Sequence, residues 1–335
     1  MSHPVHADHA RGSLITMAVA ESLGFLVEGG SPRYCNEVAT GALSADEPPW
    51  LERGEYAFGQ YATDSQLARE LARSIVACRG FTPTDYAQRI DALFDSNTAL
   101  APENATWKAA SRLAQGMTWL QVGEPAPAAG NGAVVRAAPI GLTFRTREFR
   151  SGAAQMQAEI SHHDPRSQAA AQLFAEAVFL AATTDHIEPR AFLAAIAAVA
   201  EPLDPRLASS ARSLERVLSL PLSDALPHVA RAGFVPEDGY PPSEVISGFS
   251  TPTVLWAVQS FLRNPRSPEL VIVAALSGGG DTGSVAAAAG ALVGAHVGFS
   301  GLGTRLQTWS ERLNDHGEDG RDVLSTLGAQ LVGRA

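Results

Sequence analysis

Two short segments of the chain place an acidic side chain beside hydroxyl groups where a helix is expected to begin. Asp64 follows Thr63 in the first segment, and Asp281 precedes Ser284 in the second, which is rich in glycine. Carboxylate and hydroxyl oxygens are the ligands that a hard cation such as Mg²⁺ prefers. If the segments meet in the folded chain, these four side chains predict one divalent cation. The simpler interpretation is that an acid or threonine caps each helix.

A third segment contains Asn131, Gly132 and Arg136. An Asn-Gly pair permits a tight turn with exposed backbone amides, which suit a phosphate or a ribose. The Arg136 guanidinium could hold a phosphate through two parallel hydrogen bonds. A structural salt bridge explains Arg136 equally well from the residues alone.

Two further positions could take part in proton transfer or ligand binding. His162 and His163 precede Asp164, but no further ligands stand at zinc spacing, so a hydrogen bond from His162 to a ligand or to backbone is favoured over a zinc site. Glu28 follows an apolar helix and enters a glycine-rich loop. It is either a solvated loop acid or a general base above a cleft.

The bulk composition bounds the class of protein. The chain has 335 residues, of which 45% are hydrophobic, and a formal net charge of −10, so nucleic acid is an unfavourable partner. Two cysteines provide no disulfide framework, and we expect a reducing, cytoplasmic setting. No segment has the length or apolarity expected of a membrane span. Residues 1–10 are polar and are expected to form a disordered tail.

Helical periodicity runs through most of the chain and must position these side chains. The pattern predicts one compact all-α domain over residues 11–335, and the best strand candidate is Ala133–Leu142. Helix starts are indicated where Thr82, Asp164 and Ser267 each precede a proline. The predicted helices are 12–26, 64–79, 84–95, 104–120, 165–183, 187–200, 207–219, 222–232, 252–263, 267–276, 284–298, 303–314 and 319–332.

In order and spacing, these segments resemble the ADP-ribosylglycohydrolase family, in particular its dinitrogenase-reductase-activating type. The resemblance runs from about Arg11 to Leu331 and implies an all-α, single-domain fold, a compact orthogonal helical bundle. It also implies hydrolysis of an N- or O-glycosidic bond at C1″ of ADP-ribose, assisted by two Mg²⁺ or Mn²⁺ ions. Glu28 matches the loop glutamate of the family. The resemblance assigns substrate contacts to Asn131, Gly132, Arg136, His162 and Gly280.

The match at the metal site is incomplete. The family's Thr-Asp-Asp becomes Ala62, Thr63 and Asp64, and the second acid of its last motif becomes Gly283. The Gly-Asp pair of its first helix becomes Ala20-Glu21. Two dications beside two carboxylates would repel each other with little compensation. We therefore expect at most one Mg²⁺ or Mn²⁺, or none, held by Thr63, Asp64, Asp281 and Ser284.

Two functions remain open from the sequence. The first is a divergent ADP-ribosyl glycohydrolase with Glu28 or Asp64 as the base that activates water. The second is a non-catalytic protein that uses the same cleft to bind ADP-ribose or to regulate a partner. The residues do not name the acceptor group, which could be arginine, serine, nucleic acid or a small molecule.

Overall fold

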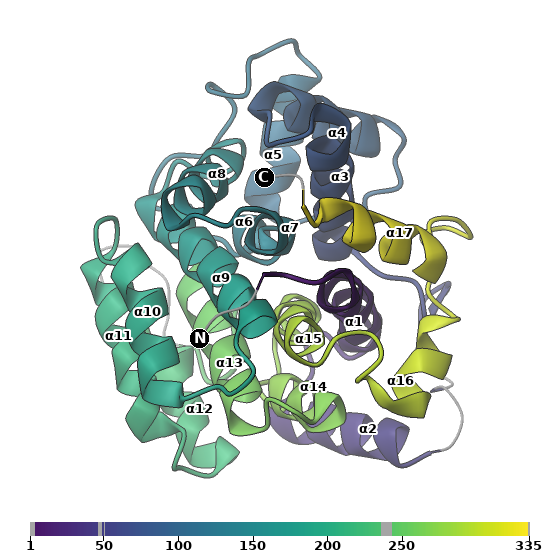
Figure 1. Cartoon of the computed structure of the whole chain (residues 1–335), viewed down its shortest axis with the longest axis vertical. Coiled ribbons are helices and arrows are strands. Elements are labelled where there is room, and N and C mark those ends of the chain that lie inside the picture. Colours follow the sequence, from purple (N-terminus) through teal and green to yellow (C-terminus); the bar gives the residue numbers. More distant parts are fainter. Residues whose placement is uncertain (1–3, 46–48, 50, 236–242, 334–335) are drawn as a thin grey trace.

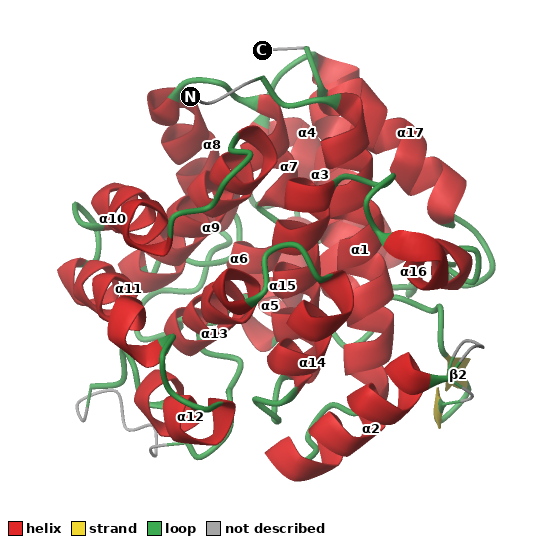
Figure 2. Ribbon diagram, turned by 60° about the horizontal axis from the view of Figure 1, so that its bottom comes forward, coloured by secondary structure: helices red, strands yellow, loops and turns green. Residues whose placement is uncertain are grey.

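Two helices buried on all sides, α1 (Ala7–Leu26) and α15 (Thr282–Val297), form the centre of the molecule. Figure 1 shows them side by side, with the other helices arranged around them. The computed structural model describes residues 4–45, 49, 51–235 and 243–333. Across these residues the fold is all-α, as expected, apart from a hairpin of two-residue strands, β1 (Glu52–Arg53) and β2 (Tyr56–Ala57). Figure 2 shows how little strand the chain contains.

Small residues let the two central helices approach closely. A Cβ added at Gly290 of α15 would lie 2.8 Å from Ala20 Cβ of α1, which no real pair of carbons tolerates. The helices run antiparallel, because Gly12 of α1 lies against Gly294 while the Thr282 hydroxyl donates to Gly24 O over 2.7 Å. The end of α1 therefore lies beside the start of α15, which brings the Glu28 loop toward Asp281.

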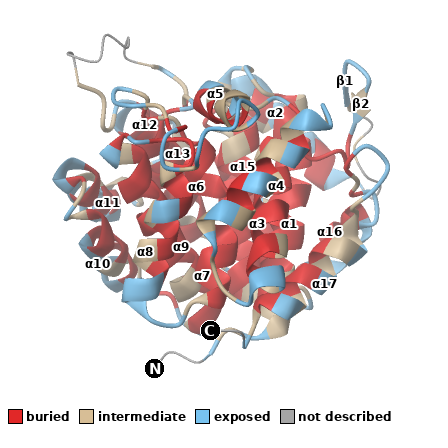
Figure 3. Ribbon diagram, turned by 90° about the horizontal axis from the view of Figure 1, so that it is seen from above, coloured by how far each residue is buried: buried red, intermediate tan, exposed pale blue. Residues whose placement is uncertain are grey.

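The remaining helices cover this pair. Figure 3 shows buried residues concentrated along the central helices and exposed residues on the outer ones. Against α1 and α15 pack α3 (Thr63–Cys78), α9 (Pro165–Thr183), α13 (Ser250–Arg263), α14 (Pro268–Leu276) and α17 (Arg321–Leu331). The other helices are α2 (Pro32–Ser44), α4 (Pro83–Asp95), α5 (Asn104–Leu113), α6 (Gly132–Val135), α7 (Ala138–Thr143), α8 (Arg147–Glu159), α10 (Pro189–Ala200), α11 (Pro205–Val217), α12 (Leu222–Ala230) and α16 (Gly303–Ser310).

Several expected boundaries differ from those observed. The strand expected at Ala133–Leu142 is wrong, because this segment forms the short helices α6 and α7 with both faces buried. A continuous apolar run suits a buried helix as well as a buried strand. The helix expected over 104–120 ends at Leu113, and α2 and α8 were not among the expected helices. Residues 7–10, expected in the tail, form the first turn of α1, where Ala10 is buried.

The three expected helix starts differ in whether a side chain caps the helix. Asp164 caps α9 by accepting a hydrogen bond from Arg166 N over 2.9 Å, with Pro165 in the first turn. Thr82 and Ser267 occupy the N-cap positions of α4 and α14, but their side chains make no capping hydrogen bond. Among the described residues, no helix combines the length and the apolarity needed to cross a membrane.

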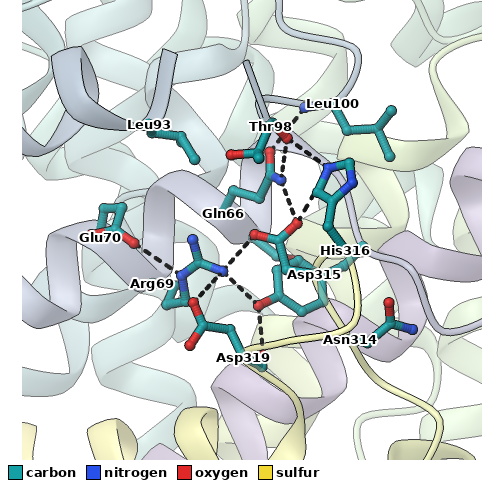
Figure 4. A network of polar contacts seen from close by, with 12 residues as sticks. Gln66, Arg69, Glu70, Leu93, Thr98, Leu100, Asn314, Asp315, His316 and Asp319 are labelled. Carbon is teal, nitrogen blue, oxygen red and sulfur yellow. Dashed lines mark hydrogen bonds and ion pairs between the residues drawn. The ribbon is translucent and has the colours of Figure 1, made fainter. Parts of the chain in front are cut away.

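A buried ionic network fixes α3, the helix that presents Asp64. Figure 4 shows the Arg69 guanidinium at its centre, between α3 and the loop before α17. Arg69 Nη1 donates to Asp315 Oδ2 over 2.6 Å and to the Tyr61 hydroxyl over 2.9 Å, and lies 3.0 Å from Asp319 Oδ2. The Gln66 amide donates to Asp315 Oδ1 over 2.7 Å. Because these groups are shielded from water, they hold the start of α3 in one position.

Candidate functional site

The starts of α3 and α15 line one small cavity together with the end of α1. Its volume is about 40 Å³, enough for a water molecule or an ion. The sequence-predicted residues Glu28, Thr63, Asp64, Asp281 and Ser284 all lie in its wall, and so does Gly132. Tertiary structure therefore brings together the two segments that the sequence suggested as halves of one site.

Glu21 of α1 organises the α3 side of this cavity. The N-cap residue of α3 is Ala62, which has no side chain able to cap, so the sequence-based interpretation of Thr63 or Asp64 as the cap is wrong. Instead, Asp64 N and Ser65 N each donate to one carboxylate oxygen of Glu21 over 3.1 Å. A carboxylate at this place also offsets the positive end of the helix dipole. Burial nevertheless raises the pKa of Glu21 to about 7.

Asp64 and Asp281 face each other across the cavity as a pair of perturbed acids. Burial, followed by the nearby carboxylates of Glu21 and Asp281, holds the pKa of Asp64 well above its usual range. Burial raises the pKa of Asp281 as well. The Ser284 side chain lies within hydrogen-bonding reach of both acids and favours their charged forms. Carboxyl groups that share a desolvated site resist ionising together.

Asn131 reaches this site from the loop before α6, and its role is to position Asp281. Its Nδ2 donates to Asp281 Oδ2 over 2.6 Å and to the Thr253 hydroxyl over 2.9 Å. Asp281 also caps α15 by accepting from Ser284 N over 3.3 Å. The capping interpretation and the site interpretation of Asp281 are therefore both satisfied by one side chain.

Glu28 lies at the mouth of the small cavity, where Arg53 of β1 holds it. Arg53 Nη1 donates to Glu28 Oε2 over 2.6 Å and to Phe25 O over 2.9 Å, and its guanidinium covers the Phe25 ring. Burial and the charge of Asp281 raise the pKa of Glu28, against the opposing effect of Arg53. A raised pKa suits an acid that exchanges protons near neutral pH.

A second and much larger cavity, of about 850 Å³, adjoins the first. Its described wall comes from the start of α5, the loop 124–130 and the segment 243–249. The Phe249 and Phe234 rings stack at 4.7 Å between centroids in this wall. A nucleotide-sized ligand fits such a volume. Among the described residues, Glu103 is shared by the walls of the two cavities.

Arg136 and His162, expected at the substrate, lie behind this wall and are fully buried. Arg136 donates to Gln157 Oε1 over 2.7 Å and to the Ser161 hydroxyl over 2.7 Å. The Ser161 oxygen lies 2.8 Å from His162 Nδ1, and His162 Nε2 lies 3.2 Å from Glu103 Oε2. In this conformation neither side chain presents surface to a ligand. The Glu103 carboxylate is the member of this group that lines the cavity.

Gly280 has a structural position near the small cavity rather than a place in its wall. Its φ is +69°, in the left-handed region that favours glycine. Its N–H donates to Gly30 O over 3.0 Å, and its carbonyl accepts from Gly29 N over 2.8 Å. Gly280 thus ties the Glu28 loop to the segment that carries Asp281.

The donor set can be compared with what a divalent cation needs. Asp64, Asp281 and Ser284 direct oxygens into the small cavity, whereas the Thr63 hydroxyl donates to Leu100 O. Within the described residues, no group of three or more His, Cys, Asp or Glu side chains is arranged around a point that could hold a metal. Two carboxylates and one hydroxyl are oxygen ligands of the type that a hard cation completed by water prefers.

Comparisons with known proteins bear on this arrangement. A sequence model of the ADP-ribosylglycohydrolase family matches residues 2–335. The chain belongs to the ADP-ribosylglycohydrolase family. The family assignment made from five short segments is therefore confirmed across the whole chain.

Relatives of this family member are distant in sequence. ADP-ribosylhydrolase ARH3 of Gallus gallus is 29% identical over 324 residues, which cover 86% of this chain and 85% of that protein. An uncharacterised protein of Archaeoglobus fulgidus is 26% identical, with coverage of 96% and 95%. A solved structure titled "ADP-ribosylglycohydrolase-related protein complex" superposes with a TM-score of 0.69 at 23% identity, covering 97% of both chains. That similarity confirms the fold.

Sequence reasoning missed three side chains of this site. Glu103 precedes α5 in a segment that carries no motif, although an acid before a helix start is a signal for an N-cap. Arg53 lies in a loop that the sequence left uninterpreted. The sequence identified Glu21 only as the residue that replaces the family's aspartate in the first helix. Its capping of α3 joins two helices that are far apart in sequence.

Proposed function

We propose that this ADP-ribosylglycohydrolase family member hydrolyses an N- or O-glycosidic bond at C1″ of an ADP-ribosyl or related nucleotide-ribosyl group. The observation that carries the proposal is the convergence of Asp64 and Asp281 in one buried cavity beside one of nucleotide size. Retained carboxylates in a desolvated cleft are what water activation requires.

One Mg²⁺ or Mn²⁺, at most, would be held by Asp64, Asp281 and Ser284, with Thr63 as a weaker neutral ligand. Such an ion would supply positive charge that stabilises negative charge developing near the ribose. The chain's own contribution is the base. Glu28 is our preferred candidate, because its raised pKa and its place at the cavity mouth suit proton transfer from water. Asp64 is the alternative.

A second candidate function is a non-catalytic ADP-ribose-binding or regulatory protein of the same fold. Two observations favour it: the Thr63 hydroxyl is engaged with Leu100 O, and Glu28 is engaged with Arg53. Both groups must change partners before they serve a reaction. The two functions make opposite predictions for turnover.

The test combines calorimetry with a product assay on the full chain. ADP-ribose is titrated with and without Mn²⁺, and release of ADP-ribose is measured from ADP-ribosyl-arginine and ADP-ribosyl-serine peptides. Turnover that falls at least 100-fold in Asp281→Asn supports the hydrolase. Metal-independent binding without turnover supports the non-catalytic function and rejects the hydrolase. Two tightly bound ions per chain would reject our account of the metal site.

A further inference from the structure

The ion pair between Arg53 and Glu28 is not sufficient by itself to hold Glu28 in one position. Both side chains are partly exposed, and a pair this accessible to water contributes little. Arg53 has two further contacts at the end of α1: Nη1 donates to Phe25 O over 2.9 Å, and Cζ lies 4.6 Å from the centroid of the Phe25 ring. The position of Arg53 therefore depends on how the hairpin of β1 and β2 packs against Phe25.

Tyr56 packs this hairpin against Phe25. Tyr56 of β2 lies directly opposite Arg53 of β1, so the two side chains share one face of the hairpin. The Tyr56 ring meets the buried Phe25 ring edge to face, with 6.0 Å between centroids. An edge-to-face pair has a preferred geometry, so it fixes orientation as well as distance. The Tyr56 ring thus sets the direction in which Arg53 extends toward Glu28.

His316 contacts Tyr56 as well. The two rings are also edge to face, with 6.1 Å between centroids and an angle of 85°. His316 Nε2 lies 2.9 Å from Thr98 O, and because a carbonyl oxygen can only accept, Nε2 carries the proton. The backbone N–H of His316 donates to Gln60 Oε1 over 2.8 Å. Tyr56 is therefore in contact with one ring from α1 and one from the loop before α17.

The buried network around Arg69 sets the position of His316. The φ of His316 is +51°, in the left-handed region, within a turn in which Asp315 N donates to Glu318 O over 2.8 Å. The neighbouring Asp315 carboxylate accepts from Arg69 Nη1 over 2.6 Å. Figure 4 shows His316 beside Asp315 at this network. The network that fixes the start of α3 therefore also fixes the ring that contacts the hairpin.

The base of the hairpin has separate anchors. The Phe58 ring lies 5.2 Å from the Trp309 ring of α16, edge to face, and both residues are buried. Asn314 N donates to Gly59 O over 2.9 Å. Loss of the Tyr56 ring should therefore leave the base attached and change the orientation of β1 over Phe25.

We propose that Tyr56 and His316 are positioning residues for Glu28. Their rings and that of Phe25 form an aromatic clamp, which holds the hairpin on the end of α1 and so keeps the Arg53 guanidinium on the Glu28 carboxylate. The inference rests on the proposed function, in which Glu28 is the preferred base, but the aromatic clamp itself can be tested without turnover.

The first measurement follows the Arg53 guanidinium by ¹⁵N NMR in the full chain, without metal or ligand. Nη1 makes both hydrogen bonds, so a clamped Arg53 should give separate Nη1 and Nη2 signals, whereas rotation about the Nε–Cζ bond averages them. Arg53→Ala assigns the signals. We expect Tyr56→Ala and His316→Asn to merge them, and Tyr56→Phe, which keeps the ring, to leave them separate. Asparagine is chosen because it tolerates the left-handed conformation.

The second measurement is the pH–rate profile. Arg53 lowers the pKa of Glu28, so loss of the aromatic clamp in Tyr56→Ala should move the acidic limb about 0.5 pH unit higher. Arg53→Ala should move it in the same direction. If Tyr56 acts through Arg53, adding Tyr56→Ala to Arg53→Ala should move the limb no further, whereas independent effects would add.

The matched control is Phe81→Ala. Phe81 and Tyr86 form another edge-to-face pair, at 6.5 Å between centroids, and Phe81 lies beyond the C-terminal end of α3. This substitution should leave the Arg53 signals and the pH–rate profile as they are in the unmodified chain. Melting curves establish that every variant is folded at the temperature of the measurements.

Three results overturn the inference. They are separate Arg53 signals in folded Tyr56→Ala or His316→Asn, one averaged signal in the unmodified chain or in Phe81→Ala, and additive shifts of the acidic limb in the double variant. Any of them leaves peptide turnover, and with it the proposed function, intact. Signals that merge as expected in a chain without turnover would retain the aromatic clamp and reject the proposed function.

Discussion

Asn131 Nδ2 lies 2.6 Å from Asp281 Oδ2, and this hydrogen bond joins the loop before α6 to the start of α15 across 150 residues of sequence. It gives the buried Asp281 carboxylate a donor that favours its charged form. Asn131 is buried, so the loss of this hydrogen bond is not readily made good by water.

Asn131→Ala removes that donor. The pKa of Asp281 should then rise further, so that the carboxyl holds its proton to higher pH. We expect Mn²⁺ affinity at pH 7 to fall about 10-fold and the free energy of unfolding to fall by about 1–3 kcal/mol. Calorimetry and urea unfolding measure the two effects. Unchanged Mn²⁺ affinity in a folded variant would remove Asp281 from the candidate ligands.

Gly283→Asp restores the acid that the family motif has at this position. There is room for the side chain, because the nearest atom to an added Cβ is Phe25 N at 3.8 Å. A carboxylate in the first turn of α15 is also favourable for the helix dipole. We expect Mn²⁺ affinity to rise at least 10-fold.

The control for that substitution is Gly41→Asp on α2, where an added Cβ meets nothing within 4 Å. It adds the same charge far from the cavity and should leave Mn²⁺ affinity unchanged. Equal gains in both variants would mean that net charge, rather than a rebuilt ligand, explains the effect.

Glu21 should make stability depend on pH. Burial raises its folded-state pKa from 4.5 to about 7, so the folded chain binds a proton that the unfolded chain has released. The associated stabilisation is complete below about pH 4.5 and is lost as the pH rises to about 7, on the order of 3 kcal/mol.

Glu21→Gln removes this titration. In metal-free buffer, the melting temperature of the unmodified chain should decline between pH 5 and pH 8 more steeply than that of the variant. Identical slopes would show that Glu21 titrates normally despite its burial.

Arg53→Ala should alter Glu28 more than it alters stability. The pair is partly exposed, with 44% and 31% of the two side chains accessible, and such pairs contribute about 0–1 kcal/mol. Arg53 lowers the pKa of Glu28, so its removal raises that pKa. If Glu28 is the base, the acidic limb of the pH–rate profile moves to higher pH.

The control is Arg33→Ala, which breaks the exposed Arg33–Glu37 pair on α2 without touching Glu28. Its pH–rate profile should match that of the unmodified chain. If the acidic limb of the pH–rate profile does not shift in Arg53→Ala, Glu28 is not the base and Asp64 becomes the candidate.

Arg69→Ala should be the most destabilising of these substitutions. It leaves the buried Asp315 carboxylate without its guanidinium partner, which costs about 3–5 kcal/mol, whereas Glu70 and Asp319 keep Arg73. Arg73→Ala, which affects a pair that is 31% and 22% exposed, should cost much less. Urea unfolding of the two variants compares them directly, and similar losses would argue against a dominant role for the buried guanidinium.

Local sequence patterns were sufficient for the family, for the all-α class and for most helices. Periodicity and proline-led starts are carried by neighbouring residues, so they can be recognised without the fold. The same holds for Asp64 and Asp281, whose glycine and hydroxyl neighbours indicated a site at two helix starts. The segment of Ala133–Leu142 shows the limit, because burial on both faces removes the periodicity that separates helix from strand.

Tertiary structure alone decided what each site residue faces. The sequence predicts substrate contacts for Arg136 and His162, yet both are fully buried, and Glu103 from a distant segment lines the cavity instead. The cap of α3 comes from Glu21 of α1, and Glu28 is held by Arg53 of β1. These contacts join residues that are tens of positions apart, and the direction of a side chain depends on the neighbours that the whole fold supplies.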